Sequence, residues 1–218
     1  MDRFIRQSDL INAETLAQQT LCVIGVGAIG RQVALQLAAI GASKIKLVDP
    51  DTVEDINIAT QGYRFEHIGK TKVECTAADM RGINDNIELL EVIPEKFRYT
   101  QLEQCTGVFS CVDKISVRTN IYNRIKLFDT PFFVDGRMLG EVLRVLTIYD
   151  ADSNKYYEST LFAQEEQQDG RCTARSTIYT ANIAAGFMLT SFTKYLRKMP
   201  IDYDVLFNIA AMDLTKLA

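Results

Sequence analysis

Short hydrophobic runs alternate with helical patterns along the first two thirds of the chain. Residues 21–26 are too short and too rich in β-branched side chains for a helix, so they predict a buried strand. Apolar residues then recur at helical spacing from Ile29 to Ile40, and Gly41 stands where a C-terminal glycine cap is favoured. Residues 45–49 predict a second strand. This strand–helix–strand unit fits a right-handed βαβ crossover.

The alternation of predicted strands and helices continues to about Gly136, and beyond it two neighbouring strands are predicted without a helix between them. Further strands are expected over residues 87–92, 107–112 and 132–134, and helices after Gly69 and over residues 115–128. Beyond Gly136, the pattern predicts neighbouring strands over 142–149 and 155–161 joined by a turn, a polar loop over 162–173, a helix over 178–196 and a last strand over 205–212. We therefore expect an α/β, Rossmann-type, mostly parallel sheet with helices on both faces and an antiparallel C-terminal extension. The expected organisation is one domain over 1–218, with a nucleotide-binding half (1–135) and a substrate-facing half (136–218).

Composition narrows the functional classes. The 218 residues are 47% hydrophobic and 24% charged, which suits one sizeable core, and the net charge of -4 gives no basic footprint for nucleic acid or an anionic membrane. We expect no membrane span and no secretory signal, since the first residues are polar and no apolar run is long enough. The five cysteines are scattered without a C-x-x-C pair, so neither a disulfide framework nor a zinc site is expected. A cytoplasmic protein is the natural interpretation.

A glycine-rich segment lies between the first predicted strand and helix. Gly25, Gly27 and Gly30 form a G-x-G-x-x-G pattern around Val26, Ala28 and Ile29. The first glycine permits a tight turn, the second lets the backbone approach phosphate, and the third lets the helix pack closely on the strand. Together with an aspartate at the end of the second strand, the pattern favours a nucleotide site. The alternative is a glycine turn that serves only close packing.

Polar residues further along the chain distinguish an NAD site from a nucleoside triphosphate site. The glycine loop alone would favour NAD, because Asp49 is placed to accept from a ribose hydroxyl. Asp51 and Asn57, in the segment after that strand, argue against NAD. Lys72 and Asp113 fit a triphosphate better, since they supply a cation for phosphate and a carboxylate for magnesium. Lys72 as a solvated helix residue and Asp113 as a helix N-cap are the alternatives.

Four segments, taken in order, resemble the ThiF/MoeB/HesA and ubiquitin-activating-enzyme family. Residues 3–7 resemble its R-Y-x-R-Q, residues 49–57 its D-x-D-x-V-x-x-S-N, residues 69–73 its G-x-x-K-[VA], and residues 111–118 its T-D-N-x-x-x-R. The expected last helix and strand also fit, so the resemblance covers nearly the whole chain. Four motifs in order are far more specific than the glycine loop.

The resemblance implies an enzyme that uses ATP and Mg²⁺ to adenylate the C-terminal carboxylate of a small ubiquitin-like or sulfur-carrier protein or a peptide, with release of pyrophosphate. Asp49 would hold the ribose, Asn57 and Lys72 the phosphates, and Asp113 the magnesium. Arg118 would brace the helix that presents Asp113. The nucleotide-binding set implied by the resemblance is Gly25, Gly27, Ala28, Ile29, Gly30, Asp49, Asp51, Asn57, Gln61 and Lys72.

The resemblance also implies a homodimer, in which Arg6 reaches the triphosphate of the opposite subunit. The chain departs from the family pattern at Thr60, which stands where a phosphate-binding arginine is usual, and at Lys114, which replaces an asparagine. Arg64 is near enough in sequence to stand in for that arginine. The paired C-x-x-C zinc motifs of many relatives are absent. Two alternatives stay open, namely a non-catalytic relative that binds nucleotide or a ubiquitin-like partner, and an NAD-dependent oxidoreductase.

Cys172 is a candidate catalytic nucleophile. Relatives that form a thioester or acyl-persulfide place their cysteine at a comparable point, and Arg171 and Arg175 flank it here. Nearby cations lower a thiol pKa and favour the thiolate. Cys22 and Cys111 lie in apolar strands and are better explained as core residues. His67, the only histidine, is assigned a surface or packing role.

Overall fold

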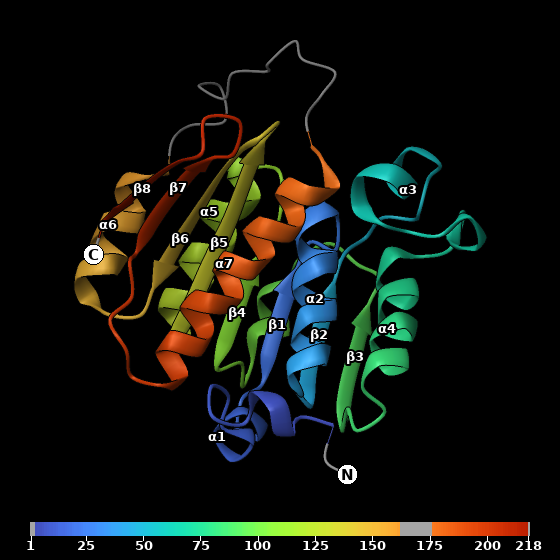
Figure 1. The fold of residues 1–218 in the computed structure, drawn as a ribbon, viewed down its shortest axis with the longest axis horizontal. Coiled ribbons are helices and arrows are strands. Elements are labelled where there is room, and N and C mark those ends of the chain that lie inside the picture. The colour runs from blue at the N-terminus through green and yellow to red at the C-terminus, as the bar shows by residue number, and fades with distance from the viewer. Residues whose placement is uncertain (1–2, 162–175, 218) are drawn as a thin grey trace.

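A computed structural model describes residues 3–161 and 176–217 and contains one eight-stranded sheet (Figure 1). The strand order is β3-β2-β1-β4-β5-β6-β7-β8, with parallel pairing from β3 to β5 and antiparallel pairing from β5 to β8. The strands are β1 (Leu21–Ile24), β2 (Lys44–Val48), β3 (Leu89–Ile93), β4 (Gly107–Ser110), β5 (Phe132–Leu139), β6 (Val142–Ile148), β7 (Asp204–Asn208) and β8 (Asp213–Leu217). The mostly parallel sheet with an antiparallel C-terminal extension confirms the predicted fold class.

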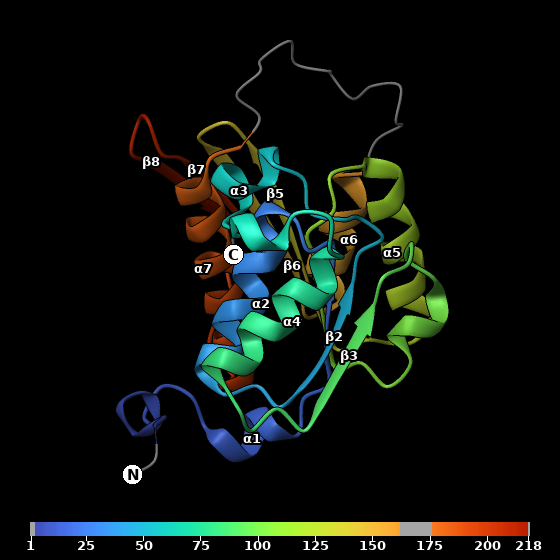
Figure 2. The ribbon, with the colours of Figure 1, turned by 90° about the vertical axis from the view of Figure 1, so that its right-hand side faces the viewer.

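Helices cover both faces of the sheet (Figure 2). One face carries α2 (Ala28–Ile40), α4 (Lys72–Ile83) and α7 (Ile178–Leu196), and the other carries α5 (Ile115–Leu127) and α6 (Ala151–Ser159). Short elements complete the described chain: α1 (Ala13–Ala17), α3 (Ile56–Gln61) and the 3-10 turns η1 (Ile5–Gln7), η2 (Phe65–His67) and η3 (Tyr99–Leu102). None of the helices in these described residues is long and apolar enough to cross a membrane.

Burial on both faces explains the continuous apolar run of β1. Leu21 and Val23 pack in the core under α2, α4 and α7, whereas Cys22 and Ile24 pack in the core under α5 and α6. A parallel strand covered on both sides reads as unbroken hydrophobic sequence. The helix that follows ends at Gly41, whose φ of +98 and backbone bonds to Leu37 and Ala38 form the predicted left-handed cap.

The strand predicted over 155–161 and the turn predicted before it are wrong, because this segment is α6. Asp150 is the N-cap of α6, accepting from the Ser153 N–H at 2.8 Å, and the Ser153 hydroxyl accepts from the Asp150 N–H at 3.1 Å. This capping box starts a helix at residues that also favour turns. Tyr156 and Tyr157 resemble strand residues in sequence, but Tyr157 is buried as a helix residue against Phe133.

The last strand, predicted over 205–212, is two strands. β7 ends at Asn208, and β8 begins at Asp213 and pairs antiparallel with β7. The Asn208 side chain accepts from the Ala211 N–H at 3.2 Å, and Met212 has a positive φ of 53. An apolar turn of Ile209, Ala210 and Ala211 carries no glycine or proline signal, so the hydrophobic pattern did not reveal it.

Candidate functional site

The glycine loop joins β1 to α2 at the carboxyl edge of the parallel strands. Gly25 has a φ of +84, and a Cβ there would lie 2.8 Å from the carbonyl oxygen of Cys111, so only glycine fits this turn. A Cβ on Gly30 would lie 1.8 Å from the carbonyl oxygen of Gly25. These two glycines fold the loop tightly against the sheet, which is the packing role that the motif predicts for them.

Gly27 has a different environment. Among the described residues, a Cβ on Gly27 would meet only the Gln61 side chain, with Oε1 at 3.8 Å, so this part of the chain leaves the space in front of Gly27 open. Gly27 is also the N-cap of α2, so the N–H groups of Ala28 and Ile29 have no acceptor within the helix. Open space before free N–H groups is what the close approach of a phosphate requires. Packing alone explains Gly25 and Gly30, but it does not explain Gly27.

The Gln61 side chain is the neighbour of the Gly27 position. Its Oε1 is buried without a hydrogen-bond partner among the described residues, while its backbone carbonyl accepts from Gln32 Nε2 at 3.1 Å. A buried amide oxygen that finds no donor costs free energy. A ligand bound before Gly27 would supply such a donor if it carried a hydroxyl, an amine or an ordered water.

Asp49 holds the end of β2 on the glycine loop. Its carboxylate is 6% exposed, with Oδ2 accepting from the Val26 N–H at 2.6 Å and Oδ1 from the Asp51 N–H at 2.8 Å. Burial raises the pKa of Asp49, although both N–H donors oppose that rise. Each oxygen keeps a second lone pair, so the expected contact with a ribose hydroxyl stays a prediction.

Lys72 and Asp51 are brought together by the start of α4. Lys72 Nζ lies 3.0 Å from Asp51 Oδ2, and the Lys72 N–H donates to the Asp51 carbonyl at 3.0 Å. Lys72 is 7% exposed, which rules out a solvated helix residue, whereas the Asp51 side chain is 62% exposed. Nearby, Asn57 Oδ1 accepts from the Glu54 N–H at 2.9 Å and so closes the loop that leads into α3.

Asp113 follows β4 at the same edge of the sheet. It is exposed, and the N-cap of α5 is Lys114, so the alternative that Asp113 caps this helix is wrong. Within the described residues, no group of three or more His, Cys, Asp or Glu side chains is arranged to hold a metal. Mg²⁺ is commonly held by one or two carboxylates together with substrate phosphates, so the exposed Asp113 carboxylate suits this metal and its role stays a prediction. Arg118 donates to the carbonyl of Val112, immediately before Asp113.

Arg6 belongs to the η1 segment, which packs on the C-terminal end of α2 (the N-terminal segment is blue in Figure 1). It is exposed on η1, whose flanking Phe4 ring lies against Gly41 and whose Gln7 side chain donates to the Ala39 carbonyl at 3.4 Å. Both contacts are at the C-terminal end of α2. A helix of 13 residues spans about 20 Å, and Gly27 is at its other end.

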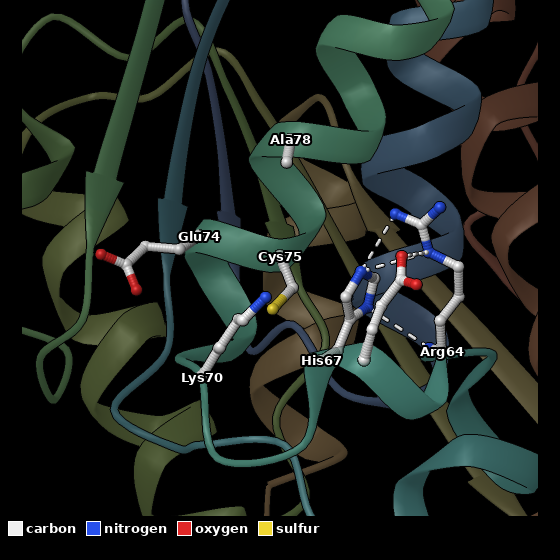
Figure 3. A pocket seen from close by; sticks show the side chains of 7 residues that line it. Arg64, His67, Lys70, Glu74, Cys75 and Ala78 are labelled. Atoms are coloured by element: carbon white, nitrogen blue, oxygen red, sulfur yellow. Dashed lines mark hydrogen bonds and ion pairs between the residues drawn. The ribbon is translucent and has the colours of Figure 1, made fainter.

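Thr60 stands where the family pattern has a phosphate-binding arginine, and Arg64 is the nearby arginine that could replace it. Both side chains contact other groups of the protein. The Thr60 hydroxyl donates to the Ile56 carbonyl at 3.0 Å, within its own helix. Arg64 pairs with Asp79 at 2.6 Å and contacts Nε2 of His67, on a cavity of about 300 Å³ between η2 and α4 (Figure 3). His67 is buried there, so of the two expected roles, surface or packing, the structure supports packing.

Sequence reasoning missed Tyr63, which locks the segment after α3 onto the glycine loop. Its hydroxyl donates to the Val26 carbonyl at 2.6 Å and shares a hydrogen bond with Thr76 Oγ1 at 3.1 Å. The Arg31 guanidinium lies 4.4 Å from the centre of its ring. A single tyrosine in a polar stretch gives no sequence signal for such a contact.

Cys172 lies outside the described residues. Of the cysteines expected in the core, Cys22 is fully buried, and Cys111 is partly buried with its thiol pKa raised by burial.

The family model of the ThiF family matches residues 3–216. The chain belongs to the ThiF family. This confirms the resemblance that four short segments indicated in the sequence. The match runs from the N-terminal η1 segment to β8, so it includes both the parallel and the antiparallel parts of the sheet.

Two curated relatives cover different shares of the chain. Ubiquitin-like modifier-activating enzyme 5 of Bombyx mori is 28% identical over 212 residues, which is 85% of this chain and 52% of that protein. Adenylyltransferase and sulfurtransferase MOCS3-1 of Zea mays is 30% identical over 152 residues, which is 65% of this chain and 31% of that protein. The chain therefore spans about half or less of these relatives' length.

Solved structures share the fold. PaaA aligns with a TM-score of 0.79 at 21% identity, over 99% of this chain and 81% of that one. E. coli MccB, crystallised with ATP, aligns with a TM-score of 0.76 at 17% identity, over 99% of this chain and 71% of that one.

Proposed function

We propose that this chain is an ATP-dependent adenylyltransferase that activates the C-terminal carboxylate of a small ubiquitin-like or sulfur-carrier protein or of a peptide. The space that the described residues leave before Gly27, beside a buried Gln61 Oε1 that has no partner among them, is the observation that carries the proposal. Asp49 follows β2, Asp113 follows β4, and Lys72 begins α4, at the same edge of the sheet. Relatives named as adenylyltransferases and modifier-activating enzymes support the same conclusion.

The proposed chemistry is a displacement at the α-phosphorus of ATP. A carboxylate oxygen of the substrate forms the new P–O bond, and the bond between the α-phosphorus and the bridging oxygen breaks so that pyrophosphate leaves with its electron pair. The N–H groups of Ala28 and Ile29 bind phosphate, and Lys72 supplies positive charge. Asp113 would hold Mg²⁺, which supplies charge neutralisation when bound. The reaction then depends on positioning and electrostatics.

A homodimer with composite sites is part of the proposal. Arg6 is exposed at the end of α2 opposite to its own glycine loop, which supports a role at the loop of a second chain. A two-fold axis crossing α2 would bring the Arg6 of each subunit toward Gly27 of the other. Such an arginine would add positive charge to a site in which Thr60 replaces the usual one.

Cys172 is retained as a proposed nucleophile for a second step. Its thiolate would attack the acyl-adenylate carbonyl, a C–S bond would form, and AMP would leave. We expect a thiol-sensitive covalent adduct with the carrier that is absent in Cys172→Ser. An unchanged adduct in that variant would exclude the role.

ATP–pyrophosphate exchange with purified protein and a candidate carrier tests the proposal. Exchange that Asp113→Ala abolishes supports adenylation. Binding of ATP without exchange for any carrier favours a non-catalytic relative. Binding of NADH without binding of ATP would favour the oxidoreductase and overturn the proposal.

A further inference from the structure

Asp135 lies in β5 without solvent exposure and accepts three hydrogen bonds. Its Oδ1 accepts from Arg118 Nη1 at 3.0 Å, and its Oδ2 accepts from Arg137 Nε at 2.8 Å and from the Tyr157 hydroxyl at 3.1 Å. Removing a charge from water is costly unless partners and hydrogen bonds compensate for it. Here both carboxylate oxygens are satisfied. Burial and the Asp135 charge raise the pKa of Tyr157, so its hydroxyl remains a donor.

Arg118 connects the Asp135 carboxylate to the backbone at the edge of the sheet. Its Nη2 donates to the carbonyl oxygens of Val112 and of Gly136, the latter at 3.3 Å. The strand register pairs Ser110 with Asp135, so the carboxylate lies beside the end of β4. One guanidinium therefore joins β5 to the backbone carbonyl that immediately precedes Asp113.

Arg137 extends the cluster to the end of α6. Its Nη1 and Nη2 donate to the carbonyl and hydroxyl oxygens of Thr160 at 3.1 and 3.2 Å, and Thr160 is the C-cap of α6. The cluster thus contains one carboxylate and two guanidiniums. This leaves an excess positive charge near the carboxyl edge of the sheet, which favours an anionic ligand there.

We propose that Asp135 is a positioning residue for the metal–nucleotide complex. By holding Arg118 on the Val112 carbonyl, it fixes the backbone that carries the Asp113 carboxylate. This inference rests on the proposed function. Without the Asp135 charge, Arg118 loses its buried counter-ion and the Val112 carbonyl loses its fixed donor. Asp113 then samples more orientations, so metal binding weakens while the phosphate contacts of the glycine loop remain.

Asp204 provides a matched control. It accepts from Arg144 Nε at 2.9 Å, from Arg144 Nη2 at 2.8 Å and from the Tyr156 hydroxyl at 2.6 Å. It is 7% exposed and lies in β7, which is separated from β4 by β5 and β6. Asp204→Asn therefore disrupts the same kind of arginine–tyrosine arrangement without a change near Asp113.

The test measures Mn²⁺ binding by the loss of the free-ion EPR signal, in the presence of a non-hydrolysable ATP analogue. Asp135→Asn removes the negative charge that faces Arg118 and replaces one of the two accepting oxygens by an NH2 group, so the hold of the cluster on Arg118 weakens. We expect its Kd for Mn²⁺ to rise about tenfold, a change of one decade in affinity, and that of Asp204→Asn to stay at the wild-type value. The Mg²⁺ concentration for half-maximal pyrophosphate exchange should shift in parallel. Thermal unfolding of both variants controls for stability.

Arg118→Lys is the second variant, because it keeps the charge but cannot span Asp135 and Val112 together. It should weaken Mn²⁺ binding in the same way, and it decides the matter if Asp135→Asn does not fold. If the wild type binds the analogue and Mn²⁺, and Asp135→Asn and Arg118→Lys both bind Mn²⁺ with unchanged affinity, the positioning role is overturned and the proposed function is not. A wild-type protein that binds neither analogue nor Mn²⁺ would overturn the proposed function and this inference together.

Discussion

The hydroxyl of Tyr63 donates a 2.6 Å hydrogen bond to the carbonyl oxygen of Val26, inside the glycine loop. This bond joins the segment after α3, which contains Tyr63, to the turn that forms the proposed phosphate site. Tyr63 is 2% exposed, so neither group has water as a replacement partner. The shape of the glycine loop therefore depends on a residue about forty positions further along the chain.

Tyr63→Phe should destabilise the protein, because the Val26 carbonyl and Thr76 hydroxyl both lose a buried partner. We expect a loss of about 1–3 kcal/mol in the free energy of unfolding, measured by urea titration. Tyr99→Phe is the control, since Tyr99 is 52% exposed and its ring contact with Arg124 survives the change. Equal stability of the two variants would contradict the structural role of the Tyr63 hydroxyl.

Gly27→Ala should impair nucleotide binding without affecting the fold. The added Cβ meets no protein atom closer than 3.8 Å, but it occupies the space into which a phosphate would enter. We expect ATP affinity to fall about tenfold or more, measured by calorimetry, with an unchanged midpoint of thermal unfolding. Gly82→Ala, where a Cβ meets nothing within 4 Å, is the matched control and should bind ATP as the wild type does. Undiminished ATP affinity in Gly27→Ala would count against the phosphate site.

Gly30→Ala should have the opposite effect and disrupt the fold. Its Cβ would lie 1.8 Å from the Gly25 carbonyl oxygen, so α2 would have to move away from β1. We expect a loss of several kcal/mol in stability, as for other overpacked sites, visible as a large drop in the midpoint of thermal unfolding. If Gly30→Ala were as stable as Gly27→Ala, the close approach of α2 to β1 at Gly30 would not be needed for stability.

Asp204 should make stability depend on acid pH. Burial tends to raise its pKa, but hydrogen bonds from Arg144 and Tyr156 outweigh burial and hold the pKa below the usual 3.8. A carboxyl whose folded-state pKa is lowered stabilises the fold above its unfolded pKa, and this contribution is lost as pH falls through the folded value. Wild type should therefore be more stable than Asp204→Asn at pH 7, by about 1–3 kcal/mol, and this difference should shrink below pH 3.8. A difference that is independent of pH in urea unfolding would show that the charge of Asp204 does not stabilise the fold.

The sequence by itself determined the parallel half of the fold and the glycine loop. Both depend on local rules, because strand and helix periods and the positive φ of Gly25 and Gly41 belong to the local backbone. The sequence also predicts that Asp49, Lys72 and Asp113 lie at one edge of the sheet, since the carboxyl ends of parallel strands meet there, and their roles toward a nucleotide stay predictions. The family motifs then indicated a particular nucleotide chemistry.

Only the tertiary structure decided which of these residues contact one another. Asp49 uses both oxygens on backbone N–H groups, and Tyr63 and Asp135 bond to groups that are distant in sequence. The three-dimensional packing decides which buried polar groups become hydrogen-bond partners, and such pairs produce no periodic pattern in the sequence. Tyr157 shows the same limit for secondary structure, because a capping box and a buried contact placed it in a helix where its local propensity favoured a strand.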